Sequence, residues 1–191
     1  MTRSPSAKQI LDCALELADS CGWERLHLFE IAERLEVGLD AIARHYRQKD
    51  DLVEAWFDRA DSALLTRAQA PDLAALQPEK RLEELLMAWL NSLAAHRAVT
   101  AQMLLYKLEP GHLHLQVLGL LRISRTVQWW REAARRKNHT LSRIIEESLL
   151  SSAYVCTFLH WLRHPQEEEA DLRSFLRGQL RCAPLLLLLR R

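Results

Sequence analysis

Apolar residues recur at intervals of three and four along most of this 191-residue chain, the spacing of helices that bury one face. The first repeat comprises Ile10, Ala14, Leu17 and Ala18. It follows Ser6 and Gln9, which have the spacing of a helix-opening capping box, and precedes Gly22, a residue that commonly ends helices. The pattern therefore predicts a first helix between Ser6 and Gly22.

Residues 30–52, EIAERLEVGLDAIARHYRQKDDL, predict two short helices joined by a tight turn at Val37-Gly38. Such a pair can place its second helix in the major groove of DNA. The side chains expected on that second helix's outer face include Leu39, Asp40, Ala41 and Ala43. Few of them can donate a hydrogen bond to phosphate, so the pattern leaves open whether the motif reads DNA or is a retained scaffold.

The apolar pattern in the rest of the chain also predicts helices, and several of them begin or end at a proline. The expected ranges are 48–68, 79–97, 98–108, 112–137, 141–164 and a last helix within 166–182. Pro71 and Pro78 bracket a connector. We divide the chain into a helix-turn-helix module, 1–50, and a C-terminal helical domain, 51–191. The last two helices are strongly apolar, which fits either an intramolecular bundle or a two-fold dimer interface.

Composition supports an all-α fold, because helix formers dominate and only 5 Gly and 6 Pro interrupt them. The net charge of +1 argues against bulk attraction to nucleic acid. Residues 1–60 carry 8 basic and 12 acidic side chains, an unfavourable balance for a DNA reader. The basic residues nevertheless cluster at one place, Arg44, His45, Arg47 and Lys49.

No catalytic or metal-binding pattern stands out. None of the four cysteines forms a C-x-x-C pair, and no nucleophile elbow, phosphate loop or zinc motif is present. His160 and His164 share a helix face, but they have no third ligand at a suitable spacing and are more typical of a helix's last turn. We expect no enzyme activity, cofactor or metal. The N-terminus has no apolar signal core, so a cytoplasmic location is expected.

Residues 10–52 resemble the TetR family of transcriptional regulators. The matching features are Gly22-Trp23, Ile31-Ala32, Val37, Arg44-His45-Tyr46, Lys49 and Leu52, which align without gaps. The resemblance implies an all-helical, TetR-like homodimer. Its N-terminal three-helix modules would bind a double-stranded operator, and its C-terminal bundles would bind ligand and form the dimer through the last two long helices.

The resemblance also implies roles for individual residues. In the TetR family, residues matching Arg44, His45 and Lys49 lie near the phosphate backbone. The family usually has a hydroxyl at the position of His27, Ser or Thr at Gly38 and Ala41, and an aromatic at Ala43, and this chain departs at all four. The candidate DNA-binding residues are His27, Gly38, Leu39, Asp40, Ala43, Arg44, His45 and Lys49.

Residues 146–180 are similar to the coenzyme Q biosynthesis lipid-binding family, in which a W-L turn precedes an acidic helix start. That similarity implies an alternative function, an accessory protein that binds isoprenoid lipid and has a vestigial helix-turn-helix. A ligand-responsive DNA-binding regulator of the repressor type is the function that we expect first.

Apolar and aromatic residues of the C-terminal helices are candidates to line a pocket for a small apolar ligand or isoprenoid lipid. They are Trp89, Met103, Tyr106, Trp129, Tyr154 and Phe158. The alternative is that these residues are ordinary core. Five consecutive leucines, 185–189, are expected to pack on the protein, or else to touch a membrane surface beside Arg190 and Arg191.

Overall fold

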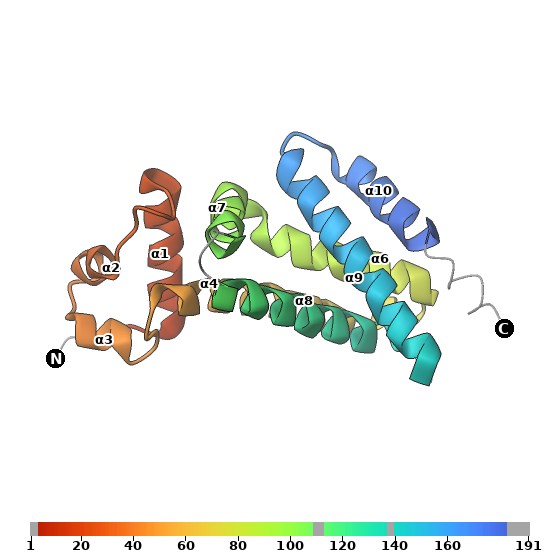
Figure 1. Cartoon of the computed structure of the whole chain (residues 1–191), viewed down its shortest axis with the longest axis horizontal. Coiled ribbons are helices and arrows are strands. Elements are labelled where there is room, and N and C mark those ends of the chain that lie inside the picture. The colour runs from red at the N-terminus through yellow and green to blue at the C-terminus, as the bar shows by residue number, and fades with distance from the viewer. Residues whose placement is uncertain (1–3, 109–112, 137–139, 183–191) are drawn as a thin grey trace. The chain divides into compact units, whose positions relative to one another are not determined.

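The computed structural model describes residues 4–108, 113–136 and 140–182 (Figure 1). Throughout these ranges the regular structure is helical, as the sequence predicts. The helices are α1 (Ala7–Cys21), α2 (Leu28–Arg34), α3 (Leu39–Ala43), α4 (Lys49–Ala68), α5 (Pro71–Ala74), α6 (Pro78–Leu93), the 3₁₀ turn η1 (Ala94–His96), α7 (Arg97–Leu108), α8 (Leu113–Ala133), α9 (Thr140–Arg163) and α10 (Glu169–Cys182).

The first helix begins and ends as the sequence predicts. Ser6 Oγ accepts a hydrogen bond from the backbone N–H of Gln9 at 3.3 Å, and the N–H of Ser6 donates to Gln9 Oε1 at 2.9 Å. At the other end Gly22 has φ of +87°, a conformation that strains any residue with a side chain. Its N–H donates to the carbonyl oxygen of Ala18 at 2.9 Å.

The chain folds into two compact units. Unit 1 contains residues 4–59 together with 95–108. Helix α7 therefore packs with the N-terminal helices, although it lies within the C-terminal domain, 51–191, that is predicted from the sequence. The hydrogen bonds that hold α7 in this unit include one from the backbone N–H of Trp23 to Gln102 Oε1 at 2.6 Å and one from Trp56 Nε1 to Thr100 Oγ1 at 2.9 Å. Both pairings join residues far apart in the sequence, which helical periodicity alone does not reveal.

Unit 2 contains residues 60–94 and the described residues from 113 onward. Helix α9 packs against α8 and α10, and α6 packs against the same two helices (Figure 1). Trp89 and Trp130 are fully buried here, and Trp130 Nε1 donates to the carbonyl oxygen of Leu82 at 2.9 Å. Burying an indole costs little free energy when its N–H keeps a hydrogen-bond partner.

Several details differ from the sequence expectations. The connector between Pro71 and Pro78 contains the short helix α5, which Pro71 opens because proline suits the first turn. Helix α8 ends at Ala133 rather than near Lys137, which lies outside the described residues, as do Pro110-Gly111 and the leucine-rich tail. Within the described ranges, none of the helices has the length and apolar character needed to span a bilayer.

The apolar stripe of α10 faces the interior of its own unit. Leu172, Leu176 and Leu180 are all buried, and Leu176 is completely inaccessible to solvent. The stripe therefore belongs to an intramolecular bundle, one of the two arrangements that the sequence leaves open. Any contact between two copies through α10 would use the helix's other side chains.

Arg173 joins α10 to α6 through two carboxylates. Its Nη1 lies 2.9 Å from Glu84 Oε1 and 3.3 Å from Glu83 Oε1, and Glu83 is 2% exposed. Arg173→Ala should lower the free energy of unfolding by about 1.5–3 kcal/mol, because it removes hydrogen bonds to two charged and largely buried groups. Urea denaturation would measure the loss. The control, Arg177→Ala, removes an exposed arginine one turn further along α10 and should change stability by less than about 0.5 kcal/mol.

The stability that Arg173 contributes should depend on pH. Burial favours a higher pKa for Glu84, but the charges and hydrogen bonds of Arg173 and Lys80 outweigh it and lower the pKa below its usual 4.5. A lowered folded-state pKa stabilises the protein above the unfolded value, and that stabilisation is lost as pH falls through the lowered pKa. The stability gap between wild type and Arg173→Ala should therefore narrow below pH 4.5. An equal gap at every pH would contradict this assignment.

Candidate nucleic-acid interface

Helices α2 and α3 form a compact helix-turn-helix within unit 1. The turn reverses at Glu36, which has φ of +54°, and the N–H of Val37 donates to the carbonyl oxygen of Ala32 at 3.0 Å. Ala32, Ala41 and Ile42 are buried, and α2 packs against α3. Helix α3 contains only Leu39–Ala43. Because Ala41 and Ile42 are its buried residues, its other side chains are directed outward.

The outward side of α3 is a mixed apolar and charged surface. Leu39 is 53% exposed, and Asp40, Ala43, Arg44 and His45 are exposed as well. We call Leu39, Asp40, Ala43 and Arg44 the α3 face. It contains half of the DNA-binding residues predicted from the sequence. Its one guanidinium, of Arg44, is accompanied by the carboxylate of Asp40.

The start of α2 adds an aromatic surface that sequence reasoning missed. Phe29 is 49% exposed, and its ring stacks on His27 with 5.3 Å between centroids and 12° between planes. The backbone N–H of His27, the residue before α2, donates to Glu30 Oε2 at 2.7 Å. The apolar repeat that predicts this helix consists of Leu28, Ile31, Ala32 and Leu35. Phe29 lies outside that repeat, and its position could have indicated from the sequence that the ring is exposed.

Gly38, Asp40 and Arg44 form a local arrangement at α3. Gly38 is the residue before the helix and has no side chain to cap it. The Asp40 carboxylate occupies the space that a Cβ at Gly38 would need, and its other oxygen pairs with Arg44 Nη2. The guanidinium expected to meet phosphate is thus engaged by a carboxylate of the same helix.

Lys49 is also engaged inside unit 1. Its Nζ donates to the carbonyl oxygen of Glu24 at 3.0 Å and lies 5.1 Å from the ring centroid of Trp23 and 5.9 Å from that of Tyr106. Loss of solvent around the ammonium lowers the pKa of Lys49, with nearby Cys21 and acidic residues opposing the shift. A phosphate contact by Lys49 would require the side chain to leave this position.

A hollow of about 390 Å³ lies beside the α3 face, between the end of α2 and α3. Its charged lining consists of three carboxylates and one guanidinium: Glu33, Glu36, Asp40 and Arg44. This balance is unfavourable for a bound phosphate.

The structure brings together three of the six candidate ligand-binding residues. Trp89 makes edge contacts with Tyr154 and Phe158 in unit 2, at centroid distances of 5.2 and 5.3 Å. Met103 and Tyr106 instead lie on α7 in unit 1, and Trp129 is 47% exposed on α8. Helical periodicity predicts that such residues are apolar contacts but not which of them meet.

A buried ionic cluster adjoins these aromatic rings. Asp61 accepts hydrogen bonds from Trp89 Nε1 at 2.9 Å, Arg122 Nη2 at 2.7 Å and Thr126 Oγ1 at 3.0 Å. Burial, and to a lesser extent the charge of Asp61, raises the pKa of Tyr154 far above its usual value, so its hydroxyl stays protonated. Sequence reasoning missed this cluster, although an aspartate among the buried Phe57, Ala60 and Leu64 was a signal.

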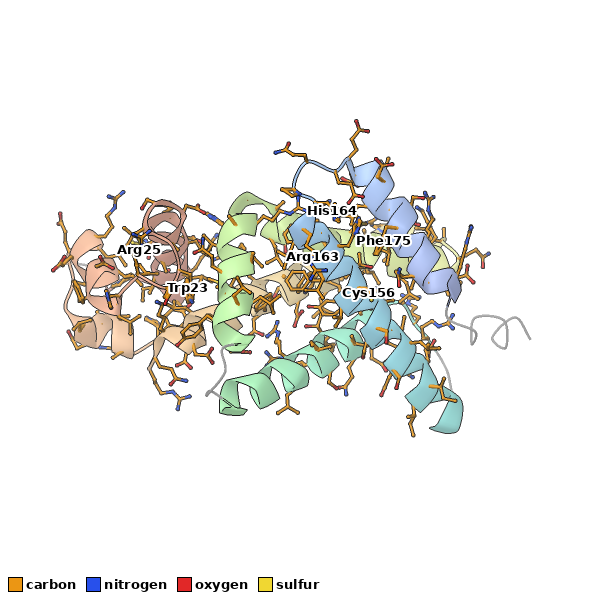
Figure 2. All side chains as sticks on the ribbon, turned by 45° about the horizontal axis from the view of Figure 1, so that its top comes forward. Trp23, Arg25, Cys156, Arg163, His164 and Phe175 are labelled. Carbon is orange, nitrogen blue, oxygen red and sulfur yellow. The ribbon has the colours of Figure 1, made fainter. Side chains whose placement is uncertain are left out.

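His160 of α9 and His164, which follows the last residue of that helix, have local partners. His160 Nε2 lies 2.9 Å from Glu167 Oε1, and its ring stacks on Phe175 at 3.9 Å. His164 Nδ1 donates to the carbonyl oxygen of His160 at 2.9 Å; Figure 2 labels His164 near the end of α9 and Phe175 on α10. No group of three metal-ligating side chains with suitable geometry occurs among the residues that the structure describes.

Comparison with known proteins identifies the family. Neither a protein-family model nor a curated protein matches the chain. Among solved structures, a TetR transcriptional regulator from Nitrosomonas europaea is 42% identical, with a TM-score of 0.82, over 93% of this chain and 97% of that one.

More distant structures share the fold. A TetR transcriptional regulator from Rhodococcus sp. RHA1 is 18% identical, with a TM-score of 0.69, over 92% of this chain and 93% of that one. Thermus thermophilus FadR, a TetR-family repressor solved with lauroyl-CoA, is 18% identical, with a TM-score of 0.62, over 94% and 93%. Given the 42% identity to the Nitrosomonas regulator over nearly the whole length of both proteins, the chain belongs to the TetR family of transcriptional regulators.

Proposed function

We propose that this chain is a repressor that binds operator DNA through the α3 face. The observation that carries the proposal is the geometry of α3, which is anchored by buried Ala41 and Ile42 and exposes Leu39, Asp40, Ala43 and Arg44 together. A short helix held rigidly in this way can enter the major groove as one body. We assign DNA binding to unit 1, and ligand binding and dimer formation to unit 2.

The charges of unit 1 support a reader with weak affinity for nonspecific DNA. Arg44 is paired with Asp40, and Lys49 donates to a backbone carbonyl. Each phosphate that a protein neutralises releases counterions and steepens the salt dependence of binding. Because these cations have intramolecular partners, we expect a shallow salt dependence, with selectivity arising at the base edges.

For the ligand, we propose a small apolar molecule that binds beside Trp89, Tyr154 and Phe158. These rings form a continuous aromatic cluster next to the Asp61–Arg122 pair. The complex of the FadR relative with lauroyl-CoA gives a precedent within this fold for a ligand with an apolar acyl chain. Ligand binding would favour a dimer state in which the two α3 faces no longer match the operator spacing.

The dimer would form through the outward sides of α9 and α10. Ser148, Ser152 and Cys156 are exposed at four-residue intervals on α9, and small side chains allow two helices to approach closely. This surface replaces the buried leucine stripe of α10 as the proposed seam.

Ser152→Arg should therefore convert the dimer to a monomer, because a long charged side chain would prevent close approach of the helices. Sedimentation velocity at micromolar concentration would measure the change. The matched control is Ser20→Arg, which makes the same substitution at an exposed position of α1 and should remain dimeric. A dimeric Ser152→Arg protein would place the interface elsewhere.

Two measurements on the purified chain test the proposed function against the lipid-binding alternative. Electrophoretic mobility shift at low salt should reveal binding to a subset of genomic DNA fragments. Mass spectrometry of an organic extract should then identify a molecule whose addition weakens that binding. An accessory protein of isoprenoid-quinone synthesis would co-purify with an isoprenoid lipid and shift no fragment, a result that would reject the repressor proposal.

A further inference from the structure

We propose that Asp40 and Arg44 act together as a base-reading pair that selects one G·C base pair in each operator half-site. This inference rests on the proposed function, since it requires the α3 face to enter the major groove. It assigns Arg44 to the bases, whereas the family resemblance implies a position near the phosphate backbone.

The first argument is the position of the guanidinium along α3. Asp40 lies in the first turn of the helix, and Arg44 follows its last residue, Ala43. The ion pair draws the Arg44 guanidinium back by one helical turn, toward the N-terminal end of α3. Residues at the N-terminal end of a recognition helix are those that contact base edges.

The second argument is the way in which Gly38 accommodates the carboxylate. A Cβ at Gly38 would collide with Asp40 Oδ1, so only glycine permits this conformation of the Asp40 side chain without a shift. Gly38 is not needed for a left-handed backbone, because its φ is −77°. The absence of a side chain at position 38 leaves room for the Asp40 carboxylate where it pairs with Arg44, and a methyl group there would make the carboxylate shift.

The third argument is electrostatic. Glu33, Glu36 and Asp40 line the adjoining hollow together with Arg44, so a phosphate there would meet more negative than positive charge. A base pair carries hydrogen-bonding groups without net charge and avoids this penalty. Cytosine N4 is a donor that suits a carboxylate, and guanine O6 and N7 are acceptors that suit a guanidinium.

The two members of the pair thus match the two bases of a single G·C pair. Leu39 and Ala43 are exposed on the same helix and can make apolar contact with a thymine methyl group. The preferred half-site would then contain one G·C pair next to a thymine-containing pair.

The test is selection from a duplex library with about 20 randomised base pairs, followed by affinity measurements on the enriched sequences. The full-length wild type should enrich one G·C pair per half-site. Asp40→Asn and Arg44→Ala should each reduce the preference at that pair by roughly tenfold or more while other positions keep theirs. Gly38→Ala should have the same effect, since it displaces Asp40 without changing any charge.

The matched control is Glu169→Gln, which removes the carboxylate of an Arg–Glu pair of the same spacing on α10 and should leave base preference unchanged. If Asp40→Asn and Arg44→Ala keep the wild-type motif and weaken binding to all sequences equally, the pair contacts phosphate and the inference is wrong. If the wild type retains no DNA at low salt, the proposed function fails together with it.

Discussion

Replacing Asp61 with alanine should be the most destabilising single change considered for this protein. Three donors converge on this carboxylate, from Trp89, Arg122 and Thr126, and the side chains of Asp61 and Arg122 are 9% and 6% exposed. Removing one member of a buried ion pair costs about 3–5 kcal/mol, because the remaining charge loses its compensation in a poorly solvated site. For a protein of this size the midpoint of thermal unfolding should fall by roughly 6–20 °C.

Calorimetry of Asp61→Ala and Asp61→Asn would measure this effect. The asparagine variant retains an acceptor for the indole and hydroxyl donors, so it should lose less stability than the alanine variant. Asp72→Ala, which removes the exposed partner of Arg67 in the same unit, should unfold close to the wild-type temperature. If Asp61→Ala were as stable as Asp72→Ala, the buried cluster would have no structural role.

Ala43→Glu should strongly weaken sequence-specific DNA binding while leaving the fold intact. Ala43 is exposed at the end of α3, so a larger side chain there disturbs no packed core. A glutamate on the α3 face would add a negative charge and bulk where the base edges must approach. Losing one or two groove contacts corresponds to a weakening of about tenfold to several hundredfold.

The control for this variant is Ala74→Glu, which adds the same charge at an exposed alanine of α5 in unit 2. Fluorescence anisotropy on a selected operator should show wild-type affinity for the control and strong loss for Ala43→Glu. Circular dichroism should show equal helicity for both. Equal affinity of the two variants would remove α3 from the DNA interface.

The sequence predicted the local features of the fold because their causes are local. The Ser6–Gln9 capping box, the end of α1 at Gly22 and the turn between α2 and α3 all depend on residues within a few positions of one another. The TetR-like fold was implied by the resemblance of residues 10–52 to that family, and the 42% identical Nitrosomonas regulator supports it. The sequence pattern did not predict α5, because a helix of four residues is too short to show a periodic apolar pattern.

The sites were less predictable because their partners are distant in sequence or depend on a rotamer. Asp61 and Arg122 are separated by 61 positions, and no periodic pattern pairs them. The inward position of Lys49 depends on the Glu24 carbonyl and on rings contributed by Trp23 and Tyr106. The Asp40–Arg44 pair was within reach of sequence reasoning, since a carboxylate and a guanidinium four residues apart often meet on a helix.

The central claim is that this TetR-family chain recognises DNA sequence through the α3 face. Its most direct test is retention of sheared genomic DNA from the source organism on the immobilised full-length chain at low salt, with Ala43→Glu measured in parallel. We predict that the wild type enriches a small set of fragments sharing a two-fold symmetric motif and that Ala43→Glu enriches none. Equal retention by both proteins, with no fragment enriched, would contradict the claim.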